Sequence, residues 1–254
     1  MSRGPMPDAG YFDKWHADMA TSPVRDAVIA RTLELPAELR DAGTLNRQGV
    51  DELTGELRLP PDGLLLDIAC GRGGYGIEVA RRTGARLIGV DFSAVAVQQA
   101  RSNGAHRLPA GRSDFRVGTL LATGLPSGSA DALMCVDAVQ FGDPPLAALR
   151  EFRRLLAPGG RLAVTCWEAT DPADDRVPAR IQAVNLLRDL PEAGFTDVRV
   201  HDRPQWRRAE LAMWEAALAE TGTDPALLSL QAEGRRSLDT ANAMRRVLAT
   251  ATAP

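Results

Sequence analysis

Cysteine, histidine and aromatic residues are all scarce in this chain of 254 residues. The three cysteines, Cys70, Cys135 and Cys166, lie in or beside apolar runs typical of strands. They have neither the paired spacing of a zinc site nor the density of a disulfide-stabilised domain. The three histidines form no cluster. We therefore expect reduced thiols in the core and no metal centre.

Long apolar runs and a large excess of one charge are also missing. No stretch approaches the roughly 20 apolar residues of a membrane-spanning helix, and no apolar signal segment opens the sequence. The formal net charge is −3, without a basic patch for nucleic acid. These absences favour a cytoplasmic protein, monomeric or homodimeric, that binds neither membrane nor nucleic acid.

Hydrophobic residues make up 44% of the chain, enough for one full core. From residue 64 onward, short apolar runs alternate with helical periods. The strands expected from this pattern are 64–68, 86–91, 115–118, 132–136 and 161–167. Strand and helix in alternation predict a doubly wound, mostly parallel sheet.

The two flanks have a different pattern. Residues 1–60 lack strand-like runs and contain helical stretches at 23–35 and 48–57, which predict a helical cap before an α/β core at 61–170. In the remainder, 171–254, we expect a helix at 181–190 and an antiparallel hairpin of strands at 196–200 and 246–252. Residues 204–243 would then be a helical insertion before the last of seven strands.

Glycine is concentrated in the turn after the first strand, Ala69-Cys-Gly-Arg-Gly-Gly-Tyr-Gly76. Ligands of open α/β sheets bind at such turns, and Gly71 and Gly73 would let backbone N–H groups approach a ligand. The spacing of the glycines also matches the dinucleotide fingerprint. A nicotinamide-dependent reductase and a tight turn without a ligand are therefore alternatives.

Two carboxylates favour S-adenosylmethionine over a dinucleotide. Asp67 precedes Gly71 by four residues, where it suits the ammonium group of an amino acid better than a pyrophosphate. Asp91 ends the second strand, where it can accept hydrogen bonds from ribose hydroxyls. The alternative role of Asp91, capping the next helix, is one that Ser93 can fill.

Five segments in order resemble the class I S-adenosylmethionine-dependent methyltransferases, in particular the small-molecule branch of ubiquinone/menaquinone-type and natural-product enzymes. The resemblance covers residues 60–168, and the terminal hairpin extends it. Its segments are Leu64-Leu-Leu-Asp-Ile-Ala-Cys-Gly-Arg-Gly-Gly-Tyr-Gly76, Gly89-Val-Asp-Phe-Ser93, Gly124-Leu-Pro-Ser-Gly-Ser-Ala-Asp-Ala132, Val136-Asp-Ala-Val-Gln-Phe141 and Leu155-Leu-Ala-Pro-Gly-Gly-Arg-Leu162.

The resemblance implies a set of cofactor contacts, two of which depart from the family pattern. Thr119 stands where the family usually has an aspartate near the adenine, and Ala69 where it commonly has glycine. The residues expected at the methionine end of the cofactor are Asp67, Ala69, Gly71 and Gly73. Those expected at the ribose and adenine are Asp91, Phe92, Thr119 and Leu120. Asp137 is expected to face the sulfonium.

The acceptor side is less defined by the sequence. Asp137 and Gln140 are expected to face the acceptor, and His16 is the candidate general base if the acceptor is a hydroxyl. Tyr11, Trp15 and Trp167 belong to a group of aromatic residues that would form an apolar chamber, with a small lid core as the alternative.

These observations predict transfer of a methyl group to oxygen, nitrogen or carbon of a small molecule by in-line displacement, and they favour a secondary metabolite as that molecule. A protein that binds S-adenosylmethionine without catalysis, or the reductase, is the alternative.

Overall fold

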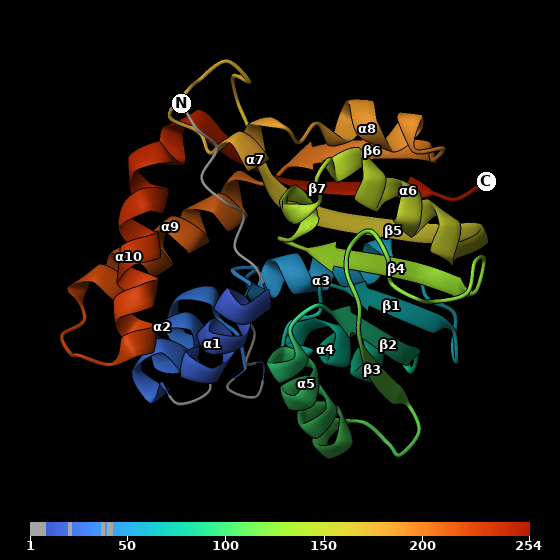
Figure 1. Ribbon diagram of the computed structural model, residues 1–254, viewed down its shortest axis with the longest axis horizontal. Coiled ribbons are helices and arrows are strands. Elements are labelled where there is room, and N and C mark those ends of the chain that lie inside the picture. Colours follow the sequence, from blue (N-terminus) through green and yellow to red (C-terminus); the bar gives the residue numbers. More distant parts are fainter. Residues whose placement is uncertain (1–8, 20–21, 37–38, 40–42) are drawn as a thin grey trace.

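A sheet of seven strands runs through the centre of the molecule (Figure 1). The computed structural model describes residues 9–19, 22–36, 39 and 43–254. The strand order is β3-β2-β1-β4-β5-β7-β6, and only β7 runs antiparallel to its neighbours. The strands are β1 (Leu64–Ile68), β2 (Arg86–Asp91), β3 (Ser113–Val117), β4 (Ala130–Val136), β5 (Leu156–Ala169), β6 (Thr196–Asp202) and β7 (Met244–Thr252).

Successive residues of the central strands enter different cores, because side chains alternate between the two faces of a sheet. Leu65 and Met134 join one core, and their neighbours Leu66 and Cys135 join the other. Two helices that follow β1 and β2, α4 (Gly74–Thr83) and α5 (Ala94–Arg107), supply the first core. The second core is closed by α6 (Pro145–Leu155) and α8 (Leu186–Glu192). All three cysteines are buried.

Helices from the two ends of the sequence pack together beside the sheet (Figure 1). Trp206 and Trp214 share a core with Val28 and Leu33, so the amino-terminal helices and the late insertion form one helical layer. This layer contains α1 (Ala9–Met19), α2 (Pro23–Leu33), α3 (Arg47–Glu56), α9 (Pro204–Ala219) and α10 (Pro225–Thr240). Across the described ranges, no helix has the length and apolarity to traverse a bilayer.

The fold class is confirmed, including a helical insertion between β6 and β7. The expected single helix at 181–190 is wrong, because the chain forms α7 (Ala179–Gln182) and then α8. Asn185 caps α8 by accepting the N–H of Arg188 at 3.0 Å, which starts a new helix there. The division into segments 1–60, 61–170 and 171–254 stays a prediction.

The fifth strand begins earlier than expected, at Leu156 instead of residue 161. Pairing with β4 shifts register between Ala130 and Ala132, so residues 157–160 form a bulge inside the strand. Gly159 takes the left-handed conformation, φ 79°, that this bulge needs.

Candidate functional site

The turn between β1 and α4 has an unusual backbone. Ala69, Gly71 and Gly73 all have positive φ, at 61°, 52° and 79°. The N–H of Cys70 donates to the carbonyl of Val90 at 3.0 Å, which joins the turn to the end of β2. The N–H of Gly73 donates to the carbonyl of Cys70 at 2.8 Å, so hydrogen bonds within the protein fix the shape of this turn.

Two glycines let the turn and the first residues of α4 lie directly on the sheet. A Cβ atom at Gly76 would overlap Oδ2 of Asp67, and one at Gly73 would lie 3.0 Å from the ring of Phe115. Asp67, which is 2% exposed, therefore packs under the first turn of α4, where a carboxylate is favoured by the helix dipole. Its expected contact with an ammonium group stays a prediction.

Asp91 connects the turn to the loop that follows β2. Its Oδ2 accepts the N–H of Gly71 at 2.8 Å, and its Oδ1 accepts the N–H of Ser93 at 2.9 Å. Burial raises the pKa of Asp91, although these N–H groups act in the opposite direction. Each oxygen keeps a second lone pair for a hydroxyl donor. Ser93 caps α5 by accepting the N–H of Ala96 at 3.1 Å, so Asp91 is not needed as the cap.

Helix α1 lies against the residues at the ends of β2 and β4. The ring of Phe12 is 5.1 Å from Phe92 and 5.9 Å from Phe141, measured between centroids. Asp13 Oδ1 accepts the hydroxyl of Ser93 at 2.5 Å and the N–H of Val95 at 3.3 Å. The role of Asp13 was not predicted from the sequence.

The other predicted residues of α1 surround Phe12. Tyr11 and Trp15 make edge contacts with Phe12 at 5.3 Å and 6.2 Å, and Tyr11 is 55% exposed. His16 is buried beside Trp15, and its carbonyl accepts Nε2 of Gln99 at 3.3 Å. Helix α1 thus brings Tyr11, Phe12 and Trp15 together.

His16 is a weak base in this environment. Burial lowers the pKa of His16 to about 4, and repulsion from Arg72 and Arg25 acts in the same direction. Its Nδ1 has no hydrogen-bond partner among the described residues. The imidazole is neutral at pH 7 and takes up a proton reluctantly, which does not favour the expected role of general base.

Asp137 lies at the end of β4 in a left-handed conformation, φ 57°. Its carboxylate accepts two hydrogen bonds from Arg246, at 2.6 Å and 3.0 Å, and one from Oγ1 of Thr165 at 2.9 Å. Although burial opposes ionisation, Arg246 and Thr165 lower the pKa of Asp137. The expected contact with the cofactor stays a prediction, and the structure commits this carboxylate mainly to Arg246.

A second carboxylate approaches the same arginine. Arg246 is fully buried, its Nε lies 3.3 Å from Oε2 of Glu210, and its guanidinium lies 5.4 Å from the ring centroid of Trp167. Nε1 of Trp167 donates to Oε1 of Glu210 at 3.2 Å. Burial raises the pKa of Glu210 to about 7, against the attraction of Arg246. We call Asp137, Arg246, Glu210 and Trp167 the buried charge cluster. The sequence analysis included neither Arg246 nor Glu210.

Gln140 is the other predicted residue after β4, in the short helix η1 (Val139–Phe141). Its Nε2 donates to the carbonyl of Asp137 at 2.6 Å, while its buried Oε1 has no partner among the described residues. That oxygen can accept a hydrogen bond from a ligand. Thr119 Oγ1 accepts the N–H of Ala122 at 3.0 Å and closes a short turn, and Leu120 packs on the second core.

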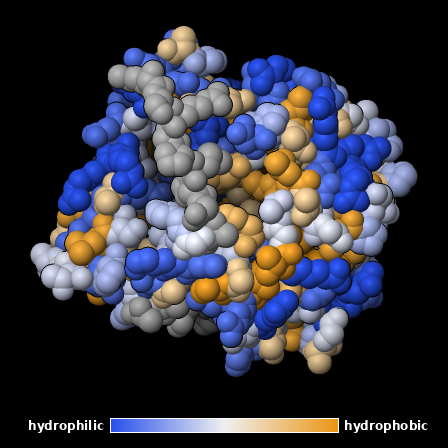
Figure 2. All heavy atoms as spheres, in the orientation of Figure 1, coloured by the Kyte–Doolittle hydropathy of each residue, from blue (hydrophilic) through white to orange (hydrophobic). Residues whose placement is uncertain are grey.

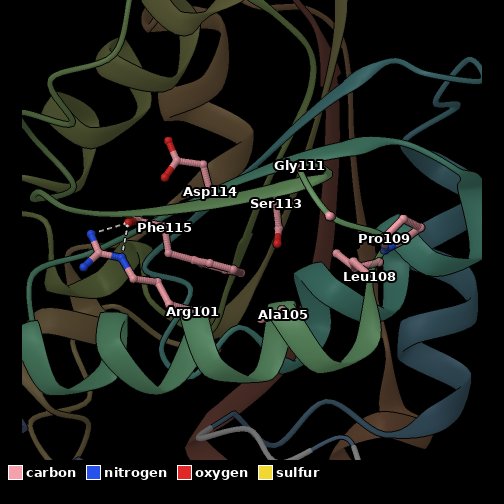
Figure 3. Close-up of a pocket in the computed structure, with 10 residues that line it drawn as sticks. Arg101, Ala105, Leu108, Pro109, Gly111, Ser113, Asp114 and Phe115 are labelled. Atoms are coloured by element: carbon pink, nitrogen blue, oxygen red, sulfur yellow. Dashed lines mark hydrogen bonds between the residues drawn. The ribbon is translucent and has the colours of Figure 1, made fainter.

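A groove of about 330 Å³ lies elsewhere, between α5 and the start of β3 (Figure 3). Arg101 reaches across it and donates to the carbonyl of Phe115 from Nε and Nη2, at 3.0 Å and 2.8 Å. Ser113, the first residue of β3, lines it, so it does not lie at the carboxyl ends of the strands. None of the predicted site residues lines this groove.

Apolar side chains gather in the middle of the face shown in Figure 2, over the region where α1, η1 and the strand ends meet. Phe12, Phe92 and Phe141 are half-buried in this region. The polar groups described above therefore adjoin an apolar surface, as is usual for sites that bind small molecules.

Comparison with known families places a methyltransferase domain at residues 66–164. A ubiquinone biosynthesis O-methyltransferase of Xanthomonas campestris pv. campestris is 31% identical over 173 residues, which are 67% of this chain and 67% of that protein. An O-methyltransferase of Pyrenophora dematioidea is 27% identical over 68% of this chain and 67% of its own. A chloroplastic tocopherol O-methyltransferase of Arabidopsis thaliana is 24% identical, with 68% and 55% covered. The chain thus spans 55 to 67% of the length of these relatives.

Solved structures share the fold over almost the whole chain. The [4+2]-cyclase SpnF aligns with a TM-score of 0.70 at 22% identity, covering 100% of this chain and 98% of its own. Phosphoethanolamine N-methyltransferase 2 of Haemonchus contortus, in complex with S-adenosyl-L-methionine, aligns with a TM-score of 0.71 at 17% identity, covering 94% and 60%. At these identities the alignments establish the fold.

Proposed function

Because the chain belongs to the class I S-adenosylmethionine-dependent methyltransferases that act on small molecules, we propose that it methylates a hydroxyl oxygen of an aromatic secondary metabolite. The O-methyltransferase names of the relatives support oxygen as the acceptor atom. The aromatic residues of α1 support an aromatic acceptor. The nicotinamide alternative is set aside, because the family uses a different cofactor.

One observation carries the proposal: the left-handed turn at 69–73 is bonded through Asp91 to the end of β2. A Cβ atom at Gly73 or Gly76 would fill the space that lets the turn lie on the sheet. The residues therefore fit an amino-acid nucleoside, with the turn at one end and Asp91 at the ribose. When bound, S-adenosylmethionine supplies an electrophilic methyl group on a sulfonium sulfur.

The chain itself would contribute alignment and the exclusion of water. Phe12 lies across Phe92 and Phe141, so it would cover the nucleoside and separate the reacting atoms from solvent. Before the acceptor loses its proton to water, Oε1 of Gln140 would accept a hydrogen bond from its hydroxyl and position that oxygen in line with the methyl group. Alignment of this kind is the main requirement of an in-line displacement.

The acceptor would have to lose its proton with little help from a protein base. His16 is weakly basic because of its low pKa, and the amide of Gln140 is neutral. We therefore expect a phenolic hydroxyl, which ionises more readily than an alcohol. The rate of transfer should rise with pH according to the pKa of the phenol, in a series of phenols of different acidity.

Calorimetry with S-adenosylhomocysteine tests the cofactor site. We expect micromolar binding and a loss of about ten- to a hundredfold in Asp91→Asn, because a hydrogen bond to a charged group contributes about 1.5 to 3 kcal/mol. Asp114→Asn, on the exposed edge strand β3, is the matched control and should bind normally. Circular dichroism of both variants checks the fold. Absence of micromolar binding by the wild type would contradict the proposal.

A protein that binds the cofactor without methyl transfer is the second candidate, since a chain with this fold is a [4+2]-cyclase. A screen of phenolic metabolites with methyl-labelled S-adenosylmethionine separates the two. Label in any phenol under turnover excludes the second candidate. Tight S-adenosylhomocysteine binding with no label in any acceptor favours it.

A further inference from the structure

The indole ring of Trp167 is held from two directions at the end of β5. In the pairing of β5 with β7, Trp167 lies directly opposite Arg246, so the two side chains share one face of the sheet. The guanidinium of Arg246 lies 5.4 Å from the centroid of the ring. At the edge of the ring, Nε1 donates to Oε1 of Glu210 at 3.2 Å. These two contacts leave the side chain, which has only two rotatable bonds, in one orientation.

Glu210 places a carboxyl group where packing alone would favour an apolar side chain. It is 3% exposed, and the residues around it on α9 enter the first core. Asp137 already balances the charge of the buried Arg246, so Glu210 is a second carboxyl group beside one guanidinium. An apolar residue of similar size often stabilises a core as well as a buried ionic group does. Packing therefore does not require a carboxyl group here, whereas the orientation of Trp167 requires a hydrogen-bond acceptor.

Trp167 belongs to the same network of contacts as the amide of Gln140. Arg246, which lies against the indole ring, donates to the two carboxylate oxygens of Asp137 at 2.6 Å and 3.0 Å. The carbonyl of Asp137 in turn accepts Nε2 of Gln140 at 2.6 Å. The helix η1, which contains Gln140, packs on both β5 and α7, and Figure 1 shows these elements near the end of β4. Trp167 therefore adjoins the part of the molecule that we expect to hold the acceptor hydroxyl.

Part of the indole of Trp167 stays accessible. The residue is half-buried, whereas Glu210 and Arg246, which hold it, are buried. Elsewhere the ring packs against a small apolar cluster that includes Val177 and Ile181. An accessible ring of fixed orientation, with apolar side chains around it and a polar amide nearby, is suited to stacking on an aromatic ligand.

We propose that Glu210 and Arg246 are positioning residues that hold the indole of Trp167 in the orientation in which it stacks on the aromatic ring of the acceptor. The assignment rests on the proposed function, because it names the residues that fix the ring of the phenol. Gln140 would hold the hydroxyl and Trp167 the ring. Because Glu210 belongs to the insertion between β6 and β7, this insertion would set the plane in which an acceptor ring fits.

Two probes that differ in aromaticity test the contact: 2-naphthol and its saturated counterpart, trans-decahydro-2-naphthol. Each is titrated by calorimetry into the protein saturated with S-adenosylhomocysteine, and the ratio of the two affinities is compared between variants. Trp167→Leu should lower this ratio by about three- to tenfold, the range of one aromatic contact. Glu210→Met keeps the length of the side chain but has no oxygen to accept the indole N–H, and it should lower the ratio by at least about twofold.

A double variant separates positioning from a general effect on the fold. Added to Trp167→Leu, Glu210→Met should not lower the ratio further, because no indole is left to position. Glu210→Gln keeps an oxygen that can accept the indole N–H, so its ratio should stay nearer to that of the wild type. Glu215→Met, at an exposed position of α9, is the matched control and should leave the ratio unchanged. Circular dichroism checks the fold of each variant.

Three results would overturn the assignment: no measurable binding of 2-naphthol to the wild type, an unchanged ratio in Trp167→Leu, or an equal effect of Glu210→Met with and without the indole. Titration of S-adenosylhomocysteine alone tests the proposed function separately, and all variants should bind it like the wild type. Failure of the wild type to bind it would contradict the proposed function. Normal binding together with an unchanged ratio in Trp167→Leu would contradict only the contact at Trp167.

Discussion

Replacing Glu210 by glutamine should change how the stability of the protein depends on pH. Glu210 is buried in the charge cluster with Arg246 on one side and Trp167 on the other. Burial raises its pKa from 4.5 to about 7 in the folded protein. The unfolded chain has no such burial, so its carboxyl keeps an ordinary pKa.

The sign follows from proton binding. Between about pH 4.5 and pH 7, the folded protein holds the proton of Glu210 more tightly than the unfolded chain does. Stability from this group is therefore complete at low pH and is lost as the pH rises through the folded pKa. One pKa unit corresponds to about 1.4 kcal/mol, so the loss amounts to about 3 kcal/mol by pH 8.

Glutamine has nearly the same shape and no charge, so Glu210→Gln should escape this loss. Urea denaturation followed by tryptophan fluorescence measures the free energy of unfolding at about pH 5 and about pH 8. We expect the variant to gain about 2.5 kcal/mol relative to the wild type between these two values, because a small part of the loss has already occurred at pH 5. Glu215→Gln, at an exposed position of the same helix, should show no such gain.

His16 contributes in the opposite direction, because its folded pKa of about 4 lies below the usual 6.5 and stability falls as the pH drops through this window. It is present in both proteins, so its contribution cancels in the difference. Parallel pH profiles of wild type and Glu210→Gln would refute the reasoning. A relative gain at low pH instead of high pH would refute it too.

Two further substitutions test the packing of the site. Gly76→Ala should lower the free energy of unfolding and weaken S-adenosylhomocysteine binding, because its Cβ atom would overlap Asp67. Gly55→Ala, where the space is open, should leave the free energy of unfolding unchanged or raise it by up to about 1 kcal/mol, and equal effects of the two variants in urea titration would contradict the expected difference. Asp137→Asn should lower the free energy of unfolding by about 3 to 5 kcal/mol, because it removes a carboxylate that compensates the buried charge of Arg246. A decrease of less than about 1 kcal/mol in the same titration would show that the ion pair does not stabilise the fold.

Local patterns predicted the half of the site that lies on β1 and β2. Asp67 lies near the end of β1, Gly71 lies in the turn that follows, and Asp91 ends β2. Parallel neighbours put these ends at one edge of the sheet, so the order of strands and turns was enough to bring them together.

The contacts around Asp137 and Phe12 could not be predicted in the same way, because they join residues far apart in the sequence. Arg246 lies in the last strand, 109 positions from Asp137, and only the antiparallel pairing of β7 with β5 brings them together. Glu210 reaches Arg246 from the inserted helix α9. The pairing of α1 with Phe92 likewise depends on how the helical layer docks, which no periodicity specifies.

The charge cluster explains how the last strand can influence a site built mainly from the first four. Asp137 has a left-handed backbone conformation that an aspartate adopts at some cost, and the two hydrogen bonds from Arg246 hold it there. Gln140 is in turn fixed by its hydrogen bond to the carbonyl of Asp137. Because Arg246 also contacts Glu210 on α9, a shift of the insertion 204–243 would move Arg246, then Asp137, and finally the amide expected to hold the acceptor. The insertion is therefore linked through Arg246 and Asp137 to Gln140, the residue proposed to position the acceptor.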